Sequence, residues 1–145
     1  MTRRTITGAA AALAAAVLVS LSACSLVVPK GDFNVTVAVK NAQHPAYGTG
    51  SNLGYVVNDV QGATLTLARG TTYTFGINAP GHPFYLTTDP TGGPSGLASE
   101  WTSGVTGNET EIGLMTFVVG QDAPALLYYQ CSVHDSMGWK IVITG

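Results

Sequence analysis

Short segments in which apolar residues alternate with polar ones recur along the chain from residue 33 onward. In residues 63–69 and 71–77, leucine or aromatic side chains occupy every second position and threonines occupy positions between them. A period of two places successive side chains on opposite faces of a β-strand. Together with enrichment in β-branched and aromatic residues, this pattern predicts seven strands, at residues 33–39, 63–69, 71–77, 83–87, 114–119, 125–130 and 139–144.

The arrangement of these strands predicts the fold class. No long stretch after the N-terminal segment has the 3.6-residue period of an amphipathic helix, and the 18 Gly and 7 Pro residues are distributed between the strands. Seven or eight short strands in about 110 residues, separated by turn signals, are typical of an all-β, two-sheet β-sandwich. Residues 89–113 are long for a connection in a compact domain, so we expect a functional flap or a partly ordered excursion there.

The first 24 residues have a different pattern. Arg3 and Arg4 precede an apolar stretch at residues 9–19, which is too short for a stop-transfer helix and which leads to Leu21-Ser22-Ala23-Cys24. This arrangement resembles a bacterial lipoprotein signal, in which cleavage precedes a cysteine that is then lipidated. We therefore expect a signal peptide at residues 1–23, a tether at 24–31 with lipidated Cys24, and one domain at 32–145.

This interpretation places the domain outside the cell membrane, lipid-anchored on its periplasmic or extracellular face. An ordinary secretory signal with an incidental cysteine is the alternative, and the two arginines leave the choice between general secretion and twin-arginine export open. From Cys24 onward the chain has four cationic and eight anionic residues, a net charge of about −4. Nucleic-acid binding requires clustered Lys and Arg, so we expect a monomer without a nucleic-acid partner.

The two cysteines of the chain differ in their expected roles. If Cys24 carries lipid, Cys131 cannot form a disulfide with it and remains a free thiol in a compartment where thiols are usually oxidised or paired. Cys131 is then either a buried cysteine acting as a small hydrophobic residue or a group protected by another role, such as metal binding.

The neighbours of Cys131 favour metal binding. Cys131-x-x-His134-x-x-Met137 lies in a connection between two predicted strands. Thiolate, imidazole and thioether together suit copper, because zinc rarely binds methionine and calcium and magnesium prefer oxygen. The strongest candidate for a fourth ligand is His82, where a loop meets a strand; His44, also in a loop and also followed by proline, is a competitor. Each residue taken alone also has a packing or turn explanation.

A family resemblance adds to this reading. The strand-rich core, the run LTLARGTTYTFGI followed by a histidine, and the Tyr-x-Cys-x-x-His-x-x-Met-Gly loop resemble the cupredoxins, the small blue copper proteins, with the ligand spacing of amicyanin. The resemblance implies an eight-stranded Greek-key sandwich or barrel. It also implies a type 1 copper centre with imidazole ligands His82 and His134, thiolate Cys131 and weak axial ligand Met137, and it favours His82 over His44.

Two positions depart from that family pattern: Pro83 follows the first histidine, where asparagine is common, and Val133 stands two residues after the cysteine, where proline is common. Such neighbours affect the potential more than they affect metal binding. We expect a non-enzymatic, one-electron Cu(I)/Cu(II) carrier that serves unidentified redox partner proteins. The alternatives are a copper chaperone or sequestration lipoprotein, and a metal-free binding module whose residues 89–113 recognise a partner.

Overall fold

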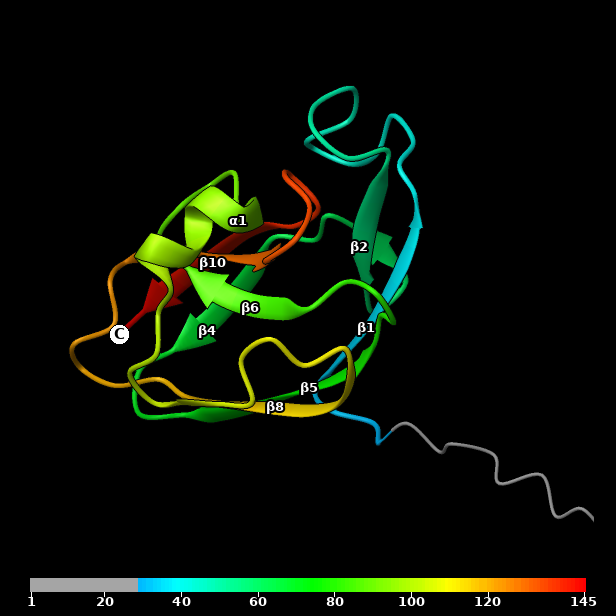
Figure 1. Cartoon of the computed structure of the whole chain (residues 1–145). Helices are drawn as coiled ribbons and strands as arrows, with labels where there is room; N and C mark the ends of the chain where they lie inside the picture. Colours follow the sequence, from blue (N-terminus) through cyan, green and yellow to red (C-terminus); the bar gives the residue numbers. More distant parts are fainter. Residues whose placement is uncertain (1–28) are drawn as a thin grey trace, which may run out of the picture.

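The computed structural model describes residues 29–145, which form two β-sheets packed face to face (Figure 1). The six-stranded sheet has the order β3-β2-β1-β5-β8-β7, and the four-stranded sheet has the order β4-β10-β9-β6. Both sheets are mixed, because β1 and β5 pair in parallel, as do β4 and β10. The all-β sandwich expected from the alternating pattern is confirmed, and within residues 29–145 the two sheets do not close into a barrel.

The seven expected strands all form, with ends displaced by two residues at most. They are β1 (Phe33–Val39), β4 (Leu65–Ala68), β5 (Thr72–Asn78), β6 (Phe84–Thr87), β8 (Ile112–Val118), β9 (Leu126–Cys131) and β10 (Trp139–Thr144). Three further strands were not expected: β2 (Leu53–Val57), β3 (Val60–Gln61) and β7 (Val105–Thr106). β2 has Gly54 inside a five-residue segment, and glycine weakens the sequence signal of a strand.

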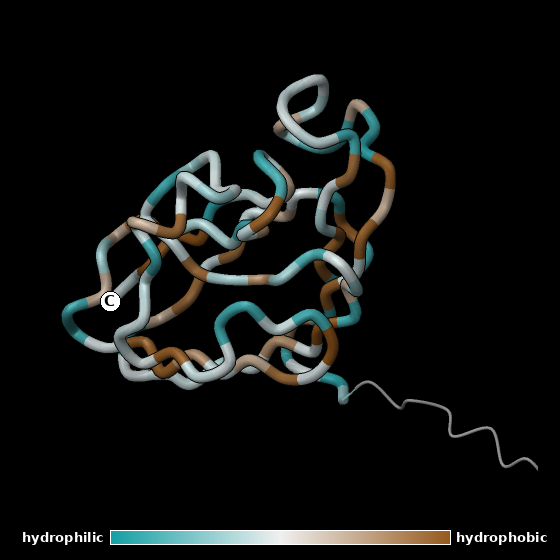
Figure 2. The backbone as a smooth tube through the Cα atoms, in the orientation of Figure 1, coloured by the Kyte–Doolittle hydropathy of each residue, from teal (hydrophilic) through white to brown (hydrophobic). Residues whose placement is uncertain are grey.

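The core between the sheets is rich in aromatic side chains. Phe84 contacts Tyr55 and Phe75 from the opposite sheet, with ring centroids 5.1 and 5.6 Å apart, and stacks on Tyr129 at 5.7 Å. All four side chains are fully buried. Figure 2 shows hydrophobic residues recurring along the strands of both layers, whereas the loop between β1 and β2 is mostly neutral to hydrophilic. The aromatic cluster therefore forms a closely packed interior.

Residues 89–113 form an ordered excursion that covers the edge strand β6. They contain a four-residue helix, α1 (Gly93–Gly96), a 3-10 turn, η1 (Leu97–Ser99), and β7. Backbone hydrogen bonds tie the excursion to β6 at Leu86, which accepts from Trp101, and at Phe84, which accepts from Glu109. The segment is ordered, so the expectation of a partly ordered excursion is not met, while a function as a flap remains a prediction.

The described part of the chain contains no helix that is long and apolar enough to cross a membrane. The expected signal peptide and the expected lipidation site at Cys24 lie outside the described residues, so they remain predictions.

Candidate metal centre

Strand pairing brings the two sequence-distant parts of the candidate site together. β6 and β9 are antiparallel, with Phe84 opposite Cys131. The backbone N–H of Ser132 also donates to the carbonyl oxygen of Pro83 at 3.1 Å. His82, just before this pairing begins, therefore lies beside the connection that starts at Cys131. The register of the β6–β9 pair thus brings His82 close to Cys131, although about fifty residues separate them in the sequence.

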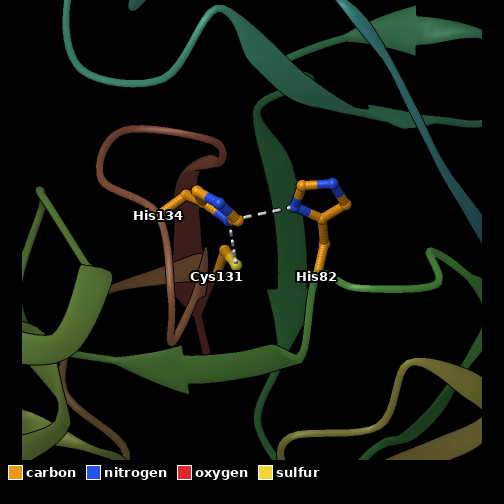
Figure 3. Close-up of side chains that lie close together, drawn as sticks. All are labelled: His82, Cys131 and His134. Carbon is orange, nitrogen blue, oxygen red and sulfur yellow. Dashed lines mark hydrogen bonds between the residues drawn. The ribbon is translucent and has the colours of Figure 1, made fainter.

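Three of the four predicted ligands converge there. Figure 3 shows the side chains of His82, Cys131 and His134 pointing toward one another. Nδ1 of His134 lies 3.2 Å from Nδ1 of His82 and 3.7 Å from Sγ of Cys131. One ligand atom from each of the three residues lies within 4.8 Å of the others. The sequence-predicted cluster of two imidazoles and one thiol is therefore present in the fold.

These distances fit a single metal ion. Two ligand atoms bound to one metal at about 2.0 to 2.3 Å, with trigonal or tetrahedral angles, lie about 3.3 to 3.8 Å apart. The 3.7 Å distance from His134 to Cys131 falls in this range, and the 3.2 Å distance from His134 to His82 is just below it. The third pair, His82 and Cys131, lies within 4.8 Å. The cluster can hold a metal ion, and its geometry is nearly complete in the fold itself.

Burial prepares the donor atoms for metal binding. Cys131 is fully buried, whereas His82 and His134 are partly exposed. Burial lowers the pKa of His82, and the neighbouring His134 lowers it further, against an opposing effect of Glu111. A lowered pKa favours the neutral imidazole, which is the form that binds metals. The site combines a protected sulfur with nitrogen donors that solvent can reach.

The turn before β6 fixes the position of His82. The backbone N–H of His82 donates to the carbonyl oxygen of Ala79 at 2.9 Å, and Gly81 between them has a φ of 77°, which glycine adopts without strain. The N–H of Gly81 donates to the Glu111 carboxylate at 2.8 Å. Glu111 thereby anchors the turn.

Tyr55 of β2 supports the same residue from inside the sandwich. Its hydroxyl donates to the carbonyl oxygen of His82 at 2.9 Å, and its side chain is fully buried. Burial raises the pKa of Tyr55 strongly, and the adjacent Cys131 thiol group raises it further when ionised. The neutral tyrosine is therefore a hydrogen-bond donor beside both His82 and Cys131. Sequence reasoning missed this residue because it missed β2.

The sulfur accepts one hydrogen bond from its own loop. The backbone N–H of Val133 donates to Sγ of Cys131 at 3.4 Å. Pro83, on the other side of the site, has no N–H to donate. Of the two positions that differ from the cupredoxin pattern, residue 133 therefore donates a backbone hydrogen bond to the thiol and residue 83 cannot.

Met137 and His44 have different places relative to the cluster. Met137 is fully buried in the same core cluster as Cys131. The ring of His44 faces backbone groups: Nδ1 accepts from the N–H of Ala46 at 3.1 Å, and Nε2 lies 3.1 Å from the carbonyl oxygen of Met137. With Nδ1 accepting, neutral His44 carries its proton on Nε2 and donates to Met137. His44 is therefore occupied with the backbone and lies outside the three-residue cluster.

Gln130 connects the metal-site loop to the excursion over β6. Its side chain is fully buried, donates to the carbonyl oxygen of Pro90 at 2.7 Å and accepts from the N–H of Gly138 at 2.8 Å. Sequence reasoning missed this role, and the only available signal was a polar residue at the end of an otherwise apolar strand. The loop that carries His134 and Met137 is consequently held at its end by a buried amide.

Fold and site together define a β-sandwich domain with a candidate His₂Cys metal centre. The chain belongs to the At5g54830-like domain family, whose model matches residues 27–145. The searches for curated proteins and for solved structures found no match.

This family membership corrects the cupredoxin resemblance, which is wrong as a family assignment. The resemblance depended on a strand-rich core and on ligand spacing, and both describe a type of site that unrelated sandwiches can carry. The three converging side chains themselves are a property of this structure and do not depend on that assignment.

Proposed function

We propose that this protein binds one copper ion through His82, Cys131 and His134, with Met137 as a fourth, weaker ligand, and that it carries single electrons. The observation that carries the proposal is the convergence of two imidazoles on one fully buried thiol. In general, two histidines and a cysteine in a trigonal arrangement, with a distant thioether, are typical of copper sites for electron transfer.

The donor set supports copper over other common metals. A structural zinc site is usually closed by four cysteine or histidine ligands, whereas calcium and magnesium take oxygen. Here the three donors are soft or borderline, and the buried hydrophobic residue Met137 follows His134 in the same loop. Soft sulfur ligands select Cu(I), zinc or iron–sulfur clusters, and a thioether among them favours copper because zinc is bound by Cys, His, Asp and Glu.

When bound, copper supplies a one-electron couple, Cu(I)/Cu(II). The chain's contribution is to hold its donor atoms at nearly fixed positions. Tyr55 and Glu111 restrain the turn that carries His82. Gln130 restrains the end of the loop that carries His134. Preorganised ligands reduce the movement that a change of charge would otherwise require. Partly exposed His134 would give a partner protein an approach to the site.

A carrier role fits this set of residues better than catalysis. The chain has three histidines, of which two belong to the cluster and His44 is bonded to backbone groups. A second, histidine-rich metal site of the kind that copper oxidases need cannot be built from them. We propose that the domain is exported and anchored by a lipid at Cys24, where it exchanges electrons with unidentified redox proteins.

A visible spectrum tests the proposal. Cu(II) added to purified protein should produce an intense sulfur-to-copper charge-transfer band, which Cys131→Ser should abolish. His82→Ala should open the copper to added imidazole and shift the band, whereas His44→Ala serves as the comparison and should retain the band. A serine variant that kept the colour would place the metal elsewhere and overturn the proposal.

The same experiment separates a carrier from a copper chaperone. A chaperone would exchange its copper readily and would lack the intense band, whereas a carrier should retain copper through repeated oxidation and reduction. The full burial of Cys131 favours the carrier, because transfer of copper to another protein usually begins at an accessible thiolate.

A further inference from the structure

Lys40 is a buried cation that holds three backbone carbonyl groups. Its side chain is 6% exposed, and its ammonium donates to the carbonyl oxygens of Ala46, Thr49 and Ser136. An ammonium has three N–H donors, so all of them are used. Two of the acceptors belong to the loop between β1 and β2, and the third belongs to the loop that carries His134 and Met137. A single charge therefore joins the two loops.

His44 makes the adjacent connection. Its ring is 2% exposed, and Nε2 lies 3.1 Å from the carbonyl oxygen of Met137, the residue after Ser136. The backbone N–H of Tyr55 donates to the same oxygen at 2.7 Å. Two successive carbonyl groups, those of Ser136 and Met137, are thus fixed from the β1–β2 side of the molecule.

Gly54 provides the space for both side chains. A Cβ atom at this position would lie 2.7 Å from Nε2 of His44 and 2.7 Å from Cγ of Lys40. Both distances are shorter than a carbon atom tolerates, so any larger residue would displace the two donors. The glycine of β2, a strand that the sequence did not predict, therefore lies where the side chains of Lys40 and His44 pack against this strand.

Two further backbone groups of this stretch are fixed as well. The carbonyl of Asp135 accepts from Ser51 at 2.9 Å, and the N–H of Ser136 donates to Thr91 at 2.6 Å. Ser136 has a φ of 60°, which is uncommon for a residue with a side chain. Such a conformation persists where surrounding contacts determine it.

We propose that Lys40 and His44 are positioning residues for the metal centre: they hold the backbone of Ser136 and Met137 so that the Met137 side chain enters the core cluster that contains Cys131. This inference rests on the proposed copper function, which it deepens by assigning the restraint on the fourth ligand. The restraint exists without metal, because every contact in it joins protein groups. It also gives buried His44 a role without making it a ligand.

Amide hydrogen exchange of the metal-free protein tests the restraint directly. Lys40→Met keeps the length of the side chain and removes the ammonium; Lys30→Met, at an exposed position, is the matched control. In Lys40→Met the amides of Ser136 and Gly138 should exchange about tenfold faster or more, with the strand amides of β9 and β10 unchanged. Rates equal to those of Lys30→Met would overturn the proposal.

A pair of His44 variants gives a second test, which also decides the matter if Lys40→Met does not fold. His44→Gln can place an amide N–H near the position of Nε2, whereas His44→Leu cannot donate. The leucine variant should show the faster exchange at Ser136 and Gly138, and the glutamine variant should stay near the wild-type rates. Equal exchange in both variants would show that the donor to Met137 has no positioning role.

Cu(I) affinity connects the restraint to Met137. Loss of an outer partner of a ligand typically costs 10- to 100-fold in metal affinity, and we expect such a loss in Lys40→Met and His44→Leu. In a Met137→Leu background the same substitutions should cost little more, because the ligand that they position is gone. Losses that add independently of Met137 would contradict the inference.

The two proposals fail in distinguishable ways. Wild-type protein without Cys131-dependent copper binding would overturn the proposed function, while the exchange rates of the metal-free variants would still decide whether Lys40 and His44 hold the loop. Normal copper binding in wild type, together with unchanged exchange in Lys40→Met and His44→Leu, would overturn the positioning role alone.

Discussion

The backbone N–H of Val133 donates to Sγ of Cys131 at 3.4 Å, and this bond reaches the sulfur from the loop side of the site. The side chain of Val133 is 51% exposed, so the residue contributes to the site through its backbone. A donor to a metal-bound thiolate withdraws electron density from the sulfur and favours the reduced metal. The reduction potential should therefore depend on whether residue 133 has an N–H.

Val133→Pro should lower the reduction potential of the copper-loaded protein. The substitution removes the donor, and a neutral hydrogen bond contributes about 0.5 to 1.5 kcal/mol. For a one-electron couple this corresponds to a fall of about 20 to 65 mV. Voltammetry measures the change, and the charge-transfer band reports whether the site is intact. Val133→Ala retains the N–H and should leave the potential near its wild-type value; a potential unchanged by proline would remove the tuning role.

Tyr55→Phe should loosen His82 without removing any ligand. The variant loses the hydroxyl that donates to the His82 carbonyl at 2.9 Å, and it leaves that oxygen without this partner. We expect a loss of about 1 to 3 kcal/mol in the free energy of unfolding, measured by urea denaturation of the metal-free protein.

Copper should also dissociate faster from Tyr55→Phe, which competition with a chelator would measure. Tyr85→Phe is a suitable control, because Tyr85 is likewise fully buried while its hydroxyl has no hydrogen-bond partner among residues 29–145. Equal effects of the two substitutions would show that Tyr55 acts through packing alone.

Much of the candidate site followed from the sequence because its signals are local. Cys131 and His134 lie three positions apart at a strand end, so their proximity needs only one loop. The position of His82 depends on the pairing of Phe84 with Cys131. The sequence predicted these two strands as short runs rich in aromatic and apolar residues, but it could not give their register.

The residues that support the site could not be predicted in the same way. Lys40 directly follows β1, and a lysine there is usually exposed. Only the fold shows that its ammonium meets three carbonyl groups. Tyr55 was missed because Gly54 interrupts the strand pattern. The family assignment was wrong for a related reason, since ligand spacing reports the chemistry of a site and several families can share it.

Cys24→Ala should release the protein from membranes or leave its N-terminal segment uncleaved. The prediction depends on the Leu21-Ser22-Ala23-Cys24 sequence, since a lipid at Cys24 would anchor the chain. Membrane fractionation of the full-length chain measures the partition. The variant should bind copper with an unchanged spectrum, because the proposed site takes its thiolate from Cys131. Wild type recovered as an unlipidated soluble protein would contradict the prediction.

Asp32 should make the stability of the domain pH-dependent far from the metal centre. Its carboxylate accepts from the backbone N–H of Thr74 at 2.7 Å and from the Thr74 hydroxyl at 2.9 Å, which joins the start of β1 to β5. These two bonds, the backbone one first, hold the pKa of Asp32 below its usual value. A carboxyl group whose pKa is lower in the folded state stabilises the fold when ionised.

The sign of the effect follows from that shift. The contribution of Asp32 is complete above the pKa of the unfolded state, about 3.9, and it is lost as the pH falls through the lower pKa of the folded state. Wild type should therefore melt at a higher temperature than Asp32→Asn at pH 6, and the difference should shrink below about pH 4. Thr74→Val removes one of the two donors, so it should raise the pKa of Asp32, measured by NMR titration, while the remaining backbone bond keeps it below the usual value. A melting difference that stays constant from pH 6 down to pH 2.5 would show that the ionised carboxylate of Asp32 does not stabilise this junction.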